Sequence, residues 1–114
     1  KEIVKLIEIN KKIKFLDKYK KFRELFNKVE SRTIGILVIF GSYANFSTNE
    51  KSDLDILIIG KNEEIQDLEE LYNIKINIVK INKKKFDKDD TLIREIIKNH
   101  VILKGVEEFI GLIW

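Results

Sequence analysis

Two aspartates stand at the start of an apolar run that otherwise has the character of a buried strand. Asp53 and Asp55 open residues 53–59 (DLDILII) and are two positions apart. On a strand, residues two apart point to the same face of the sheet, so the two carboxylates lie side by side. Two like charges in that position repel each other, which is a liability for a purely structural strand. The pair therefore predicts a strand end that holds a metal ion.

A second apolar run, residues 33–40 (TIGILVIF), ends in Gly41 and Ser42. It is apolar on both faces, as a central strand is. Glycine lets the backbone approach a phosphate without a Cβ in the way, and a helical turn that begins at Ser42 offers free amides and a hydroxyl to an anion. Ser52, just before the aspartates, is placed to cap or fix the loop. If both strand ends serve one site, the two strands run antiparallel.

Together the two strand ends supply what a nucleoside triphosphate requires. Asp53 and Asp55 offer hard oxygen ligands, which suit Mg²⁺ bound through carboxylates, water and substrate phosphates. Such a cation bridges phosphate oxygens and stabilises charge at the phosphorus under attack. Gly-Ser and Asp-x-Asp are each common alone, so the joint pattern carries the prediction of a Mg²⁺-dependent site for ATP or another nucleoside triphosphate.

The remaining segments predict helices around a small sheet. Residues 2–30 indicate two helices, or one helix broken near residues 14–17. They carry an aromatic stripe and a less regular aliphatic stripe: Phe15, Tyr19, Phe22, Phe26 and Val29, and Ile3, Leu6, Ile7 and Ile13. Further along, the patterns predict a helix over 62–72 capped by Asn62, a third strand over 74–81, a helix over 90–100 and, after Gly105, a last short helix through Phe109. We therefore expect an α/β (α+β) fold, a small mixed sheet of about three strands with flanking helices.

Length and composition bound the domain organisation. The 114 residues, 44% hydrophobic and 36% charged, suit one globular domain over residues 1–114, with helical segments 1–32 and 82–114 around a core at 33–81. The net charge of +3 is well below that of a typical nucleic-acid binder. The chain has no cysteine, and its longest apolar stretch, residues 34–40, is too short for a membrane span. With no secretory signal visible, we expect a cytoplasmic protein.

The residues G-S-Y-A at 41–44, followed after a short interval by S-D-L-D-I-L-I-I at 52–59, resemble the signature of the minimal nucleotidyltransferases of the DNA polymerase β superfamily. The resemblance covers residues 33–81, including the order strand, turn, strand, helix, strand. It implies transfer of a nucleoside monophosphate, most often AMP from ATP, to an acceptor with release of pyrophosphate. By residue, it implies that Gly41 and Ser42 hold the triphosphate and that Asp53 and Asp55 bind the metal ions.

The chain departs from that family at two places. Asn45 and Phe46 stand where many members have an arginine and a glycine, so a positive side chain near the phosphates is missing. Asn77 stands at the expected position of a third aspartate on the next strand, and its oxygen is a weak metal ligand that brings no charge and takes no proton. Other carboxylates follow the third strand, but their positions better suit a loop and a helix N-cap: Asp87, Asp89 and Asp90.

Several other residues have a plain structural interpretation. His100, the single histidine, lies near a helix end and is better explained by structure than by catalysis. The basic run of Lys83, Lys84, Lys85 and Lys88 is typical of a solvated face, with contact to an acceptor RNA as the less favoured alternative. The sequence leaves two alternatives open, whether Tyr43 flanks a nucleotide or packs, and whether Trp114 is a tail or an anchor on a partner.

Two functions follow from these patterns. The first is a Mg²⁺-dependent nucleotidyltransferase that resembles the antitoxin of a toxin–antitoxin pair, with a helical toxin as acceptor and the aromatic stripe as the contact. The second is a binding module that retains the nucleotide-binding site but has lost catalytic turnover, because Asn77 replaces the third carboxylate. The aromatic stripe also has a simpler explanation, packing on the sheet. A homodimer is a further expectation, since small domains with spare apolar helices often pair.

Overall fold

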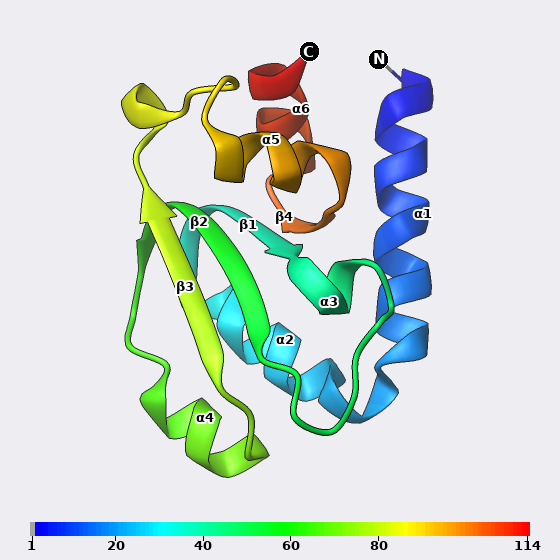
Figure 1. Cartoon of the computed structure of the whole chain (residues 1–114), viewed down its shortest axis with the longest axis vertical. Coiled ribbons are helices and arrows are strands. Elements are labelled where there is room, and N and C mark those ends of the chain that lie inside the picture. Colours follow the sequence, from blue (N-terminus) through cyan, green and yellow to red (C-terminus); the bar gives the residue numbers. More distant parts are fainter. Residues whose placement is uncertain (1) are drawn as a thin grey trace.

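A four-stranded mixed sheet forms the centre of the molecule (Figure 1). The computed structural model describes residues 2–114. The strands lie in the order β3-β2-β1-β4, and their bounds are β1 Thr33–Phe40, β2 Leu54–Asn62, β3 Ile76–Ile81 and β4 Val101–Lys104. Strands β1 and β2 pair antiparallel, as predicted, whereas β2 and β3 pair parallel. The end of β1 and the starts of β2, β3 and β4 therefore share one end of the sheet.

Helices cover both faces of the sheet, because its strands alternate apolar side chains to either side. The helices are α1 Glu2–Lys18, α2 Arg23–Ser31, α3 Gly41–Ala44, α4 Gln66–Tyr72, α5 Thr91–Lys98 and α6 Val106–Ile113, with short 3₁₀ turns at Lys20–Phe22 and Lys83–Lys85. Leu37, Ile39 and Ile56 face a core that contains Phe15 and Phe26. Their neighbours along the strands face a second core with Phe109, between the sheet and helices α5 and α6. The predicted mixed sheet with flanking helices is confirmed.

The boundaries differ from the sequence prediction in several places, and α6 continues to Ile113 instead of ending at Phe109. β4 covers residues for which the sequence predicted no strand, because four residues are too few to give a periodic signal. β2 continues to Asn62, which pairs with Thr33, so α4 begins at Gln66 and Asn62 does not cap it. The break between the first two helices falls at residues 19–22 rather than 14–17.

The aromatic stripe of residues 15–29 packs inward. Phe15, Tyr19, Phe26 and Val29 are buried in the core beneath the sheet, and Phe22 packs against it. The simpler prediction, that the stripe packs on the sheet, is correct, and the alternative that it contacts a partner is wrong. No helix of the described residues 2–114 is long and apolar enough to cross a membrane.

Candidate active site

Gly41 brings the end of β1 against the first residues of β2. Phe40 pairs with Asp55 in the β1–β2 ladder, and the chain turns into α3 at the next residue, Gly41, with a φ of 71°. A Cβ on Gly41 would lie 2.3 Å from Oδ2 of Asp55. Glycine is thus required twice here, for the left-handed backbone and for the space that the carboxylate occupies. The Gly-Ser and Asp-x-Asp motifs thus lie together at one end of the sheet, which is the arrangement that their joint pattern predicts.

Asp53, Asp55 and Asn77 meet at the same end of the sheet. Asp55 pairs with Asn77 in the parallel β2–β3 ladder, so their side chains lie on neighbouring strands. The Nδ2 amide of Asn77 donates hydrogen bonds to Oδ1 of Asp55 at 2.9 Å and to Oδ2 of Asp53 at 3.2 Å. Asn77 thus occupies the position predicted for a third ligand, but in this structure it acts as a donor that offsets the repulsion between two carboxylates.

The two predicted serines belong to the segments that follow β1 and precede β2. Ser42 belongs to α3, and because the first amides of a helix have no acceptor within it, they can donate to an anion. Ser52 has a local role, because its Oγ accepts a hydrogen bond from the Asn49 amide at 2.8 Å and its own amide donates to the Asn49 carbonyl. Ser52 therefore fixes the loop that delivers Asp53 to the site.

A cavity of about 470 Å³ opens beside Asp53, within the size range of small-molecule sites. Ser52 and Asp53 line it, whereas Gly41 and Asp55 do not. Its other walls come from aromatic rings, three lysines and the loop before β2: Tyr19, Phe22 and Tyr43; Lys21, Lys51 and Lys75; and Thr48, Asn49 and Glu50, with Asn73 and Ile74. The lysines are cations that sequence reasoning did not connect with the site, because they belong to three separate segments and form no local pattern.

Tyr43 is held in place by other aromatic rings. Its ring centre lies 4.8 Å from that of Tyr19, whose hydroxyl is 3.1 Å from the Thr48 hydroxyl. Burial, together with the neighbouring Tyr19 and Asp53, raises the pKa of the Tyr43 phenol above its ordinary value. The phenol is therefore neutral at physiological pH. Tyr43 packs against Tyr19 and also lines the cavity, so its packing role is supported, and whether it flanks a nucleotide stays a prediction.

The donor set of the site fits a hard cation. Two carboxylates and one amide oxygen are ligands that Mg²⁺ accepts, and Gly41 keeps the space beside Asp55 free of a side chain. Asn77 would have to turn its amide by half a revolution to present Oδ1 instead of Nδ2. Within residues 2–114, no group of three or more His, Cys, Asp or Glu side chains is arranged to hold a metal. The site therefore offers two charged ligands.

The alternative carboxylates and the basic run lie elsewhere. β3 starts at the site and runs away from it, so the residues after Ile81 follow its far end (Figure 1). There Asp90 caps α5 by accepting a hydrogen bond from the Ile93 amide, and Asp87 accepts one from the Asp89 amide. These roles agree with the loop and N-cap interpretation. The lysines of 83–88 follow the same far end of β3, away from the aspartate pair.

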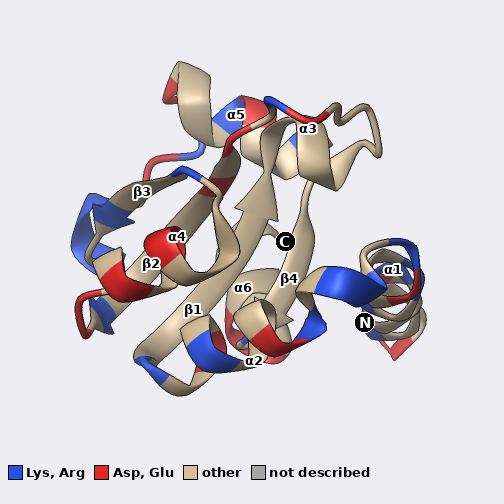
Figure 2. Ribbon diagram, turned by 90° about the horizontal axis from the view of Figure 1, so that it is seen from below, with Lys and Arg blue, Asp and Glu red and all other residues tan. Residues whose placement is uncertain are grey.

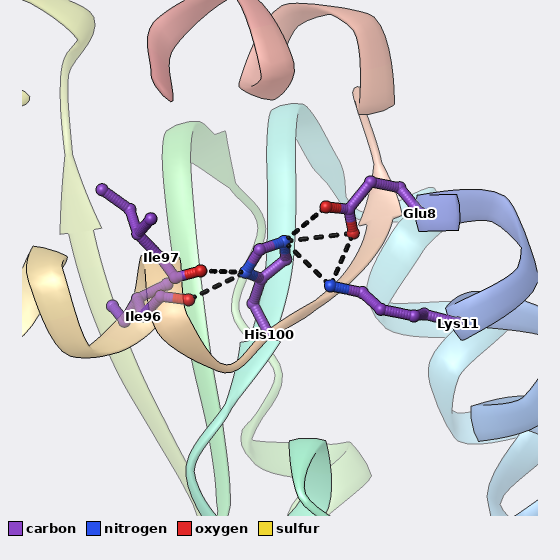
Figure 3. A network of polar contacts seen from close by, with 5 residues as sticks. All are labelled: Glu8, Lys11, Ile96, Ile97 and His100. Atoms are coloured by element: carbon purple, nitrogen blue, oxygen red, sulfur yellow. Dashed lines mark hydrogen bonds and ion pairs between the residues drawn. The ribbon is translucent and has the colours of Figure 1, made fainter. Parts of the chain in front are cut away.

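His100 belongs to a buried network at the edge of the sheet (Figure 3). Its Nδ1 faces the Ile96 carbonyl at 2.9 Å, and its Nε2 faces Oε2 of Glu8 at 2.9 Å. Lys11 completes the network with an ion pair to Glu8 at 2.8 Å. Burial raises the pKa of Glu8, but the hydrogen bonds from His100 and Lys11 outweigh it and leave the pKa below its ordinary value. The structural interpretation of His100 is thus supported, since the network joins α1 to the end of α5 and to the residue that precedes β4.

These features define a class of protein, a small nucleotidyltransferase-like domain with its acidic pair at one end of a mixed sheet. The family model described as polymerase beta, nucleotidyltransferase matches residues 20–108. The chain therefore belongs to the polymerase β nucleotidyltransferase family. The matched region contains all four strands and the candidate site, whereas α1 precedes it.

A solved structure shares the fold. It is described as the crystal structure of a toxin–antitoxin with AMP-PNP, and it aligns with a TM-score of 0.53 and 19% sequence identity. The alignment covers 91% of this chain and 82% of that one. At this identity the likeness concerns the fold. No curated protein sequence matches the chain at a significant level.

Proposed function

We propose that this chain is a Mg²⁺-dependent nucleotidyltransferase that transfers a nucleoside monophosphate, AMP from ATP, to an acceptor. The observation that carries the proposal is the meeting of Asp53 and Asp55 through Asn77, with Gly41 against Asp55 and a cavity of about 470 Å³ lined by Asp53. Membership of the polymerase β nucleotidyltransferase family supports the class of reaction.

Each residue has a role that follows from its chemistry. Asp53 and Asp55 would hold the cation through carboxylate oxygens, with Asn77 as an uncharged third ligand. Bound Mg²⁺ would neutralise phosphate charge and stabilise the charge that develops at the phosphorus under attack. Gly41 and Ser42 would hold the triphosphate through backbone amides and the serine hydroxyl, and Ser52 would keep Asp53 in place. Lysines at the cavity wall would supply the positive charge that Asn45 and Phe46 do not.

The acceptor that we propose is a partner protein, as in a toxin–antitoxin pair. The support is the solved neighbour, which is described as a toxin–antitoxin. An RNA acceptor is less favoured, because the net charge of +3 is well below that of a typical nucleic-acid binder and Lys and Arg lie among Asp and Glu in the view of Figure 2. A protein of this kind would act in the cytoplasm.

Titration calorimetry with ATP and Mg²⁺ tests the binding step. The wild type is expected to bind only when the metal is present, and Asp53→Asn/Asp55→Asn is expected to abolish binding. Asp87→Asn/Asp89→Asn is the matched control, because it removes the same charge from the far end of β3. Equal binding by the wild type and the Asp53/Asp55 double variant would refute the proposed nucleotide site.

A second candidate, a nucleotide-binding module without turnover, is favoured by one observation. Asn77 donates to both aspartates and cannot accept a proton from an acceptor hydroxyl. This candidate predicts binding of ATP and Mg²⁺ with no release of pyrophosphate. Release of pyrophosphate from labelled ATP when a partner protein is added would exclude it.

A further inference from the structure

Helix α1 turns its charged side toward the rest of the protein. Lys5 pairs with Glu107 on α6, and Glu8 lies buried against His100. Lys12 donates a hydrogen bond to the Leu103 carbonyl of β4 at 2.7 Å and lies 3.6 Å from Glu30. In its first three turns, α1 is thus anchored by these polar contacts together with the half-buried Val4, and the buried Phe15 adds an apolar anchor near its end. This is the reverse of an ordinary surface helix, which buries its apolar face.

The opposite side of α1 carries an exposed aliphatic stripe. The exposed fractions are 73% for Ile3, 65% for Leu6, 54% for Ile7 and 60% for Ile13. Figures 1 and 2 both show α1 at the edge of the molecule, with its outer side turned away from the sheet. At 1.5 Å per residue the helix is about 25 Å long, so the stripe extends over most of its length. Apolar residues gathered on one outer face indicate an interaction surface.

The spacing of the stripe is that of a coiled-coil seam. Ile3, Leu6, Asn10 and Ile13 are separated by three, four and three residues, the alternation of heptad positions a and d. Ile3 at a and Leu6 at d favour two strands, whereas Ile13 stands at the second d position; the single Asn10 at an a position then specifies register and a two-stranded parallel pair. We propose that α1 is a dimer interface, in which the stripes of two copies of this chain pack in parallel.

Asn10 favours a second copy of this chain in parallel orientation over an antiparallel copy or a different protein. In a parallel pair each stripe residue meets its own counterpart, so the two Asn10 amides hydrogen-bond to each other and every apolar residue meets an apolar one. In an antiparallel pair with Ile3 opposite Ile13, Leu6 would face Asn10 and leave the amide without a partner. A different protein would need a polar side chain opposite Asn10 to hydrogen-bond its amide, whereas a second copy of this chain supplies its own Asn10. Asp17, four residues after Ile13, is the next a position, where two copies would bring like charges together. Its ion pair with Lys20 at 3.3 Å offsets this charge.

Disulfide cross-linking tests the orientation directly, because the chain contains no cysteine. Ile3→Cys is expected to form a covalent dimer under mild oxidation. In the antiparallel alignment the two positions would be ten residues apart along the helix, about 15 Å, beyond the reach of a disulfide. Leu71→Cys, at a 66% exposed position on α4, is the control and is expected to stay monomeric. Equal cross-linking of both variants, or none at position 3, would overturn the parallel dimer.

Sedimentation velocity tests the association itself. Between about 1 μM and about 1 mM, where an interface smaller than the standard size dissociates, the wild type is expected to shift from 13.5 kDa to twice that mass. Leu6→Glu/Ile13→Glu is expected to stay at 13.5 kDa throughout, and Leu71→Glu to behave as the wild type. Circular dichroism establishes that each variant is folded. A wild type that remains monomeric, or a dimer that survives the double variant, would refute the proposal and leave the stripe to another partner.

Discussion

At residue 77, the side chain meets both carboxylates through its amide nitrogen. Asn77→Asp removes these two hydrogen bonds and adds a third negative charge beside Asp53 and Asp55. Without metal, we expect a loss of about 1–3 kcal/mol of stability, measured by thermal melting in EDTA. With Mg²⁺ the loss should be reversed and any nucleotidyl transfer should increase, because three carboxylates bind the cation more strongly.

The matched control for this variant is Asn62→Asp. Asn62 lies at the far end of β2, where its Oδ1 accepts a hydrogen bond from Lys80 at 2.9 Å. A carboxylate there gains a cationic partner, so neither EDTA nor Mg²⁺ should change its stability relative to the wild type. If Asn77→Asp behaved in the same way, position 77 would not be the missing ligand.

Gly41 gives a second prediction at the scale of one residue. Gly41→Ala introduces a Cβ 2.3 Å from Oδ2 of Asp55 and a left-handed conformation that costs about 1–2 kcal/mol. We expect lower thermal stability and loss of Mg²⁺-dependent ATP binding by calorimetry, because the carboxylate must move. Gly111→Ala, in α6 with nothing within 4 Å, should be neutral or stabilising and keep binding. Unchanged binding by Gly41→Ala would exclude a role for this close contact.

The meeting of Asp53, Asp55 and Asn77 could be predicted from the sequence, because it follows from the pairing of the strands. Asp53 and Asp55 share a face by spacing alone, and the order of strands brings Asn77 beside them. The donor role of Asn77 was not predictable, since it depends on which way an amide is turned. The same holds for Lys21, Lys51 and Lys75, which only the folded chain collects around one cavity.

At the scale of elements, α1 is joined to the sheet by the network of Glu8, His100 and Lys11 (Figure 3). The contribution of this network to stability depends on pH, because the pKa of Glu8 is lowered in the folded protein. A carboxylate whose pKa is lower in the folded state stabilises the protein above its unfolded pKa, and this contribution is lost as pH falls through the folded value. We therefore expect acid melting of the wild type to steepen below about pH 4.5.

Glu8→Gln checks this assignment. It removes the ionised partner of His100 from a buried site, with an expected loss of about 3 kcal/mol at neutral pH. The stability of the variant should change less than that of the wild type between about pH 5 and about pH 3, the range in which ordinary carboxyl groups titrate. Glu107→Gln is the control, because Glu107 is exposed and its loss should leave the acid profile nearly unchanged. Parallel acid profiles for Glu8→Gln and the wild type would contradict the assignment.

Element boundaries that the sequence missed have local causes. β4 is four residues long and apolar at three of them, which does not distinguish a strand from a helix end. Which face of α1 is buried could not be predicted from the sequence for a different reason. Its first half has two faces of comparable pattern, and the buried Glu8 finds its partner His100 only 92 residues later. Long-range pairing of that kind leaves no signal in a local window.

At the scale of the whole molecule, the candidate site exists only when the sheet is assembled. Gly41 follows β1, Asp55 lies on β2 and Asn77 on β3, so the unfolded chain holds no comparable group. The two cores on either side of the sheet share these strands, which favours a single cooperative unfolding transition. A ligand that binds the folded site alone must therefore stabilise the entire domain.

This linkage makes thermal melting a test of the site that is independent of turnover. At ligand concentrations about 100 times the Kd, ATP with Mg²⁺ should add about 2.7 kcal/mol and raise the Tm by on the order of 10 °C. Asp53→Asn/Asp55→Asn should melt at the same temperature with and without ligand, whereas Asp87→Asn/Asp89→Asn should show the full shift. The shift should also disappear in EDTA, because the carboxylates hold the triphosphate through the cation. A shift that persists in EDTA or in the Asp53/Asp55 variant would place the nucleotide elsewhere on the molecule.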